Sequence, residues 1–148
     1  MRETTLCRKE MRHDLMKAYR EVCADCPQGT TQIQVYEMVV NKPAPRFYID
    51  PRSALQVLSP IMRGDRSALE QMKPLRQQMY EDLFDVVMRL SQKKDYWCKS
   101  LYVILKDAVL QPAPRFYINT MRMGQIWKAE NIKLRIVRQN RARLMNHE

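Results

Sequence analysis

The chain has 148 residues, of which 45% are hydrophobic and 28% are charged, and this balance is typical of a folded protein and excludes a disordered one. Its net charge of +10, from 26 Lys and Arg against 16 Asp and Glu, creates a field that attracts polyanions. No stretch approaches the roughly 18 apolar residues of a membrane span, and only three glycines occur, which argues against glycine-rich phosphate loops and favours an all-α fold.

Apolar residues at intervals of three and four predict a first helix over residues 5–24. Thr31 followed by Gln34 is a capping box, which predicts the start of a second helix. Two prolines, Pro43 and Pro45, end that helix because neither can donate a backbone hydrogen bond. The residues of the second helix that we expect in the core are Ile33, Tyr36 and Val40.

After the prolines, residues 46–49 are predicted to be extended. Asp50 before Pro51 is a strong helix start, an N-cap followed by proline at the first helical position. The third helix then runs until Gly64, and residues 65–73 form a polar linker. The apolar face predicted for the third helix consists of Ala54, Leu58, Ile61 and Met62.

The second half repeats this order of elements. A long amphipathic helix follows Pro74 and ends at Lys93 and Lys94. Asp95 is predicted to cap the next helix, and Asn119 to cap the last one. The inward-facing residues of the middle helix are predicted to be Trp97, Leu101, Ile104, Leu105 and Ala108. Those of the last helix are Met123, Ile126, Trp127, Leu134 and Val137.

An internal repeat explains this parallel. The seven residues Pro-Ala-Pro-Arg-Phe-Tyr-Ile occur at 43–49 and again at 112–118, 69 positions later. Upstream, Asp14-Leu15 matches Asp82-Leu83 after a gap of one residue. We therefore expect an all-α protein of two fused homologous three-helix modules, residues 1–64 and residues 74–148. A variant of this prediction pairs the two extended connectors as a small antiparallel two-stranded ribbon.

The repeated Arg-Phe-Tyr-Ile element is the most informative motif. Side chains alternate along an extended segment, so Phe47 and Ile49 face the core while Arg46 and Tyr48 face the opposite side. A guanidinium and a phenol on one face suit phosphate contact and base stacking. The structural alternative is that the prolines fix the angle between helices while Arg46 and Arg115 pair with carboxylates or cap helix ends.

The order helix, connector, capped helix resembles a helix-turn-helix in outline, although the connector is about twice the usual length. Its helix residues would then reach phosphates, whereas the alternative is a solvated helix face. The last 30 residues are strongly basic. The predicted nucleic-acid-binding residues are Arg46, Tyr48, Arg52, Arg115, Tyr117, Arg122, Lys128, Lys133, Arg135, Arg138, Arg141 and Arg143.

Cys23 and Cys26 have the spacing of a zinc knuckle, but no second pair of ligands follows at a recognisable distance. We therefore expect buried, reduced thiols, with no metal and no cofactor. No nucleophile elbow, phosphate loop or paired metal motif is present, so we predict no catalytic residues and no enzyme activity.

The charge pattern predicts a small basic protein that binds nucleic acid, DNA in preference to RNA, through backbone phosphates. The alternative is a structural or adaptor protein of a larger assembly, a mobile-element or virion component that binds an acidic protein partner or further copies of itself. The first residues lack the apolar core of a signal peptide, which predicts a cytoplasmic location without membrane association.

Overall fold

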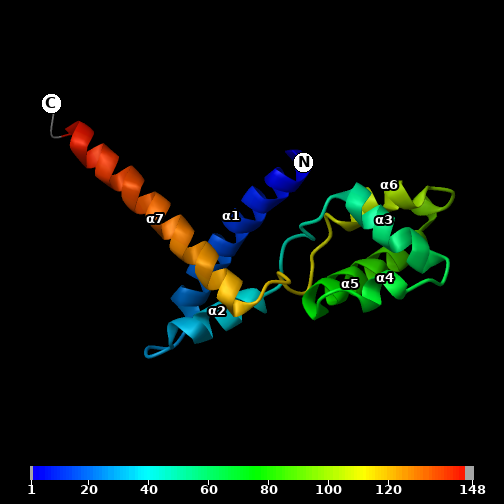
Figure 1. Cartoon of the computed structure of the whole chain (residues 1–148), viewed down its shortest axis with the longest axis horizontal. Coiled ribbons are helices and arrows are strands. Elements are labelled where there is room, and N and C mark those ends of the chain that lie inside the picture. The colour runs from blue at the N-terminus through cyan, green and yellow to red at the C-terminus, as the bar shows by residue number, and fades with distance from the viewer. Residues whose placement is uncertain (1, 146–148) are drawn as a thin grey trace.

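The computed structural model describes residues 2–145, with side chains from residue 7 onward, and this part of the chain is mostly helical and contains no strand. Two groups of helices lie on either side of a pair of extended connectors (Figure 1). The helices are α1 (Arg2–Asp25), α2 (Gln32–Val40), α3 (Pro51–Met62), α4 (Ser67–Glu70), α5 (Pro74–Ser91), the 3-10 helix η1 (Lys94–Tyr96), α6 (Leu101–Ala108) and α7 (Thr120–Met145).

Local signals place the helices of the first half correctly. The Thr31 hydroxyl accepts a hydrogen bond from the Gln34 N–H at 3.2 Å, and the Gln34 side chain accepts one from the Thr31 N–H at 2.9 Å, so the capping box is confirmed. Pro51 begins α3 as predicted. The prediction for Ile33 is wrong, because its side chain is 65% exposed. The face of α2 that packs inward consists of Val35, Tyr36, Val39 and Val40.

The start of α6 differs from the sequence prediction. Asp95 caps no α-helix, because it lies within the short helix η1. The chain then takes a left-handed turn at Cys98, where φ is 67°, and α6 begins only at Leu101 with Ser100 as its N-cap. Trp97 precedes this turn and is 58% exposed, so its prediction as a core residue is wrong.

The last helix, α7, is only partly packed. Met123 and Ile126 are buried, as predicted, and Trp127 is half-buried. Leu134 and Val137 are exposed, and the prediction that they face the core is wrong. The reason is visible in Figure 1, where α7 extends well beyond the helices that cover its first turns.

The helices pack in two groups, and each group contains helices from both predicted modules. In one group α2 packs against both α1 and α7, and in the other α3, α5 and α6 pack against one another. The third helix of each predicted module therefore lies against helices of the other module (Figure 1). This packing departs from a helix-turn-helix, in which consecutive helices pack together.

The two connectors cross between the groups. Ala44 and Ala113 form an isolated antiparallel bridge, in which each N–H donates to the other carbonyl at 2.9 Å. On either side, the Phe47 N–H donates to the Val109 carbonyl at 2.9 Å and the Phe116 N–H donates to the carbonyl of residue 40 at 3.3 Å. Both alanines are buried, and their small side chains let the two backbones approach closely. Pairing between the connectors is limited to this one bridge.

Candidate nucleic-acid interface

A basic groove of about 590 Å³ runs between α1 and α7. Arg8, Arg12 and Arg20 of α1 are spaced by multiples of four residues, which places them along one side of the helix. They face this groove together with Lys9, and α7 adds Lys133 from the other side. Met16 and Leu134 supply apolar surface between the charges. Five cationic side chains therefore converge on one open surface.

Few negative charges offset these cations. Glu130 is the one carboxylate among the groove-lining residues, and it lies 3.8 Å from Arg12 and 3.4 Å from Lys133. Arg8, Lys9 and Arg20 form no ion pair with any described residue. An open groove with unbalanced cations attracts anions, because a low-dielectric wall on each side strengthens the field between them.

Beyond this groove, the rest of α7 is an exposed basic helix. All residues from 132 to 145 are exposed, and this stretch contains Lys133, Arg135, Arg138, Arg141 and Arg143. Arg135, Arg138 and Arg141 follow one another at every third residue, so they lie along one side of the helix. At 1.5 Å per residue, this row is about 9 Å long. Glu130 precedes it, and no acidic residue follows before the end of the described chain.

Packing against α1 and α2 fixes the position of α7. The rings of Tyr19 on α1 and Trp127 on α7 stack with centroids 4.0 Å apart. Gly124 allows α7 to approach α2 closely, because a Cβ atom at this position would lie 3.1 Å from the Tyr36 ring. The basic walls of the groove are thus held by a contact between aromatic side chains and by a close helix crossing.

No protein-family model matches the chain, and no curated protein sequence or solved structure matches it either. The assignment of the interface therefore rests on the geometry and charge of the residues themselves.

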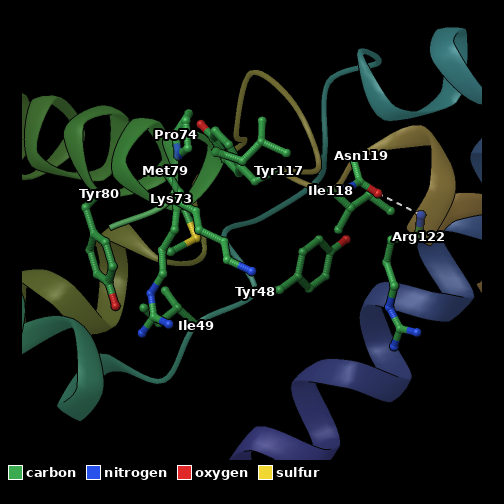
Figure 2. Close-up of a pocket in the computed structure, with 12 residues that line it drawn as sticks. Tyr48, Ile49, Lys73, Pro74, Met79, Tyr80, Tyr117, Ile118, Asn119 and Arg122 are labelled. Carbon is green, nitrogen blue, oxygen red and sulfur yellow. Dashed lines mark hydrogen bonds between the residues drawn. The ribbon is translucent and has the colours of Figure 1, made fainter. Parts of the chain in front are cut away.

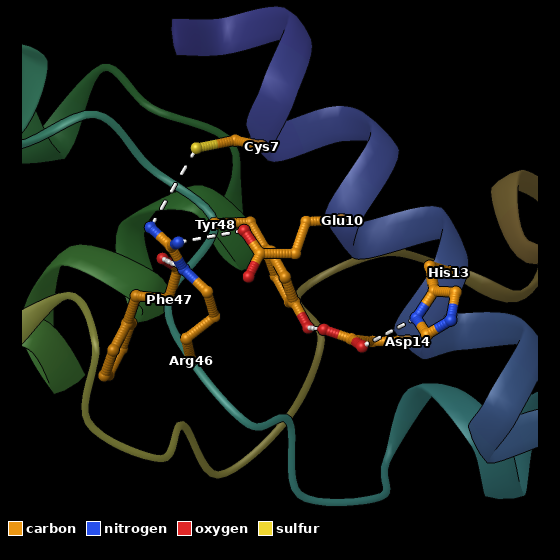
Figure 3. Close-up of polar contacts among 7 residues, drawn as sticks. All are labelled: Cys7, Glu10, His13, Asp14, Arg46, Phe47 and Tyr48. Carbon is orange, nitrogen blue, oxygen red and sulfur yellow. Dashed lines mark hydrogen bonds and ion pairs between the residues drawn. The ribbon is translucent and has the colours of Figure 1, made fainter.

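The first Arg-Tyr element makes contacts within the protein (Figure 3). The Arg46 guanidinium donates to the Glu10 carboxylate at 2.9 Å, and its side chain is only 17% exposed. The Tyr48 hydroxyl donates to Asp14 at 2.5 Å. Burial raises the pKa of Tyr48 well above its usual value, and the bond to Asp14 raises it further. Arg46 therefore pairs with a carboxylate, as the structural alternative has it, and Tyr48 is half-buried.

The second element is similar in part. The Tyr117 hydroxyl donates to Asp82 at 2.6 Å, and burial and this bond raise the pKa of Tyr117. Arg115 differs from Arg46, because its Nε is buried without a hydrogen-bond partner among the described residues. In the alignment that pairs Asp14 with Asp82, a neutral glutamine, Gln78, takes the place of the glutamate that holds Arg46.

Aromatic stacking explains why these tyrosines are half-buried. The Tyr48 ring stacks on Phe116 of the other connector at 6.0 Å, and the Tyr117 ring stacks on Phe47 at 6.1 Å. An aromatic side chain of each connector therefore packs against the tyrosine of the other connector. Tyr48 and Tyr117 thus secure the crossing of the connectors, and no residue of the two Arg-Tyr elements lines the α1–α7 groove.

The other predicted residues are distributed over the molecule. Arg52 is exposed on α3, within the opposite group of helices, and Arg122 lines a separate groove at the start of α7. Lys128 is exposed on α7, on the same helix as the basic row. We did not predict from the sequence the groove-lining cations of α1, which are Arg8, Lys9, Arg12 and Arg20. Their helical spacing in the sequence is the signal that would have indicated them.

The cysteines and acidic residues indicate no further site. Cys23 and Cys98 are exposed and Cys7 and Cys26 are half-buried, so the prediction that the thiols are buried is wrong. All four are free cysteines. The described side chains contain no cluster of three or more His, Cys, Asp or Glu residues that could hold a metal ion. Among residues 2–145, no helix has the length and apolar character needed to span a membrane.

Proposed function

We propose that the protein binds nucleic acid, with DNA as the favoured form, through the α1–α7 groove and the basic row on α7. The observation that carries the proposal is the convergence of five cations on one groove with a single carboxylate. Phosphate contacts from Lys and Arg supply sequence-independent affinity, because each neutralised phosphate releases counterions. The α7 row adds three arginines on the part of the helix that no other part of the described chain covers.

In this proposal the Arg-Tyr elements act indirectly. Their hydrogen bonds to Asp14 and Asp82 hold the connectors against α1 and α5. The connectors in turn lead into α3 and α7, so they set the direction in which α7 leaves the core. A change in these elements would then alter nucleic-acid binding only by moving α7.

The proposal includes an internal duplication in which the two copies exchange their third helices. Matching positions make matching contacts: the Tyr48–Asp14 bond corresponds to Tyr117–Asp82. The reciprocal bridge between Ala44 and the matching alanine supports an approximate twofold relation between the copies. The basic part of α7 beyond residue 131 has no counterpart after α3, so it is an addition to the second copy.

A fluorescence anisotropy titration tests the proposal. The protein would be titrated into labelled duplex DNA, single-stranded DNA and duplex RNA at about 50 mM and about 200 mM salt. We expect binding at the lower salt and a steep loss of affinity at the higher salt, with the tightest binding to duplex DNA. Absence of binding to all three probes at the lower salt would refute the proposal.

The second candidate function is that of an adaptor in a larger assembly. One observation favours it: the exposed part of α7 also carries large apolar side chains. They are Ile132, Leu134, Ile136, Val137, Leu144 and Met145. Such residues favour burial against a protein partner. A partner that buries them would bind with little dependence on salt, whereas phosphate contacts weaken strongly as salt rises.

A further inference from the structure

A second groove of about 690 Å³ lies where both connectors pass between the helix groups. The connectors supply Tyr48, Tyr117 and the isoleucines that follow them, and residues between 73 and 80 at the start of α5 and residues at the start of α7 supply the rest of the lining. In the view of Figure 2, Tyr48 lies between Lys73 and Arg122. A groove of this volume at the boundary of two helix groups has the size and location of a small-molecule site.

All charged residues that line this groove are positively charged. Lys73, Arg76 and Arg122 are exposed along its edge, and no carboxylate is among the lining residues. None of these three cations forms an ion pair with a described residue. The N-terminus of α5 also opens here without a side-chain cap, so its partial positive charge adds to theirs.

The inner surface of the groove is apolar. Ile49, Met79 and Ile118 are half-buried along it, and Leu75 on the first turn of α5 adds to the same surface. Tyr117, which also lines it, has a φ of 60°, a left-handed conformation that costs a non-glycine residue about 1–2 kcal/mol. The groove thus joins an apolar wall to a cationic edge.

A smaller groove lies beside the first connector, at the residues that match the larger groove in the internal repeat. It has a volume of about 230 Å³ and is lined by Asp50 and Ser53. In the larger groove the positions 69 residues later are Asn119 and Arg122. Both grooves contain positive charge, because Arg76 lines both of them and Arg8 lines the smaller one. The larger groove differs in having no carboxylate and in having Arg122 where the smaller one has Ser53. Asn119 and Arg122 are both exposed, so core packing does not account for this difference.

We infer that the larger groove binds a small amphipathic anion, a carboxylate or phosphate head attached to an apolar body. The head contacts Lys73 and Arg122 at the cationic edge, and the body lies against Ile49, Met79 and Ile118. Two charge-assisted contacts orient the head, while burial of the body against the isoleucines and the methionine contributes affinity. This site is separate from the α1–α7 groove and goes beyond the proposed nucleic-acid binding.

The test uses the full chain and the fluorescent anion 8-anilinonaphthalene-1-sulfonate as a probe. Octanoate, octyl phosphate and octanol would compete with it. We expect displacement by octanoate or octyl phosphate, and the stronger of the two identifies the head group. Octanol, which has the body without the charge, should displace the probe at least tenfold more weakly. Equal displacement by octanol, or none by either anion, would overturn the inference.

A matched pair of variants locates the site. Lys73→Ala/Arg122→Ala should weaken binding of the anionic probe about tenfold. Lys93→Ala/Lys99→Ala removes the same charge from exposed positions outside the groove and should leave probe binding unchanged. All four side chains are exposed, so both variants should fold, as circular dichroism can verify. Equal losses in the two variants would mean that net charge, and not the groove, holds the probe.

Discussion

Removal of the basic row on α7 should lower the salt dependence of DNA binding by a calculable amount. The substitutions are Arg135→Ala, Arg138→Ala and Arg141→Ala, and all three side chains are exposed. Each phosphate neutralised on duplex DNA contributes about −0.9 to the slope of log K against log salt, so three contacts contribute about −2.7. Over a fourfold rise in salt, these contacts account for about a 40-fold loss of affinity.

The assay is fluorescence anisotropy with duplex DNA across a series of salt concentrations. Alanine has the highest helix propensity, so α7 should remain helical in the variant. Lys93→Ala/Lys94→Ala/Lys99→Ala is the matched control, because it removes three exposed cations between α5 and α6. These lysines lie in the other group of helices, away from α7 (Figure 1). The control should keep the slope of the unmodified protein.

Two results would refute the reasoning. An unchanged slope in the α7 variant would exclude this row of arginines from contact with phosphates. An equal fall in the slope for both triple variants would show that the protein responds to net charge alone and that the α1–α7 region has no special role.

Two further predictions concern the contacts that hold the interface in place. Tyr48→Phe/Tyr117→Phe should lower the free energy of unfolding by about 1–3 kcal/mol per lost hydrogen bond. The pKa of each tyrosine in the folded state lies above the unfolded value of about 10, so the stability that these tyrosines contribute is complete below that pH and falls above it. Urea titrations at about pH 8 and about pH 11 should therefore show a smaller loss of stability at the higher pH in the variant than in the unmodified protein. Gly124→Val should lower stability by about 1–3 kcal/mol in thermal unfolding, because its side chain meets the Tyr36 ring, whereas Gln125→Val on the exposed side should change stability little; equal effects at both positions would contradict this close contact.

Sequence patterns predict the helices well where the signals are local. The capping box at Thr31, the proline at the start of α3 and the proline pairs that end α2 and α6 act through neighbouring backbone groups. Such signals do not depend on the rest of the fold. The signal at Asp95 does not start an α-helix, because Asp95 lies within η1 and the chain takes a left-handed turn at Cys98 before α6 begins.

The candidate site was only partly predictable. The basic row on α7 is visible in the composition of the last helix, and the structure leaves it exposed. The cations of α1 become part of a groove only because α7 packs beside that helix through Tyr19 and Trp127. The two residues are 108 positions apart, and no local pattern encodes their contact.

Residue spacing alone therefore decided the helical character of the chain, most helix boundaries and the repeated connector, because these follow from backbone hydrogen bonding and side-chain periodicity within a few residues. Tertiary structure decided which helices pack together and which side chains remain exposed. Tyr48 illustrates the reason: alternation places it opposite Phe47, but the second connector brings Phe116 against that side. An extended segment has two faces, and only the folded chain determines what covers each of them.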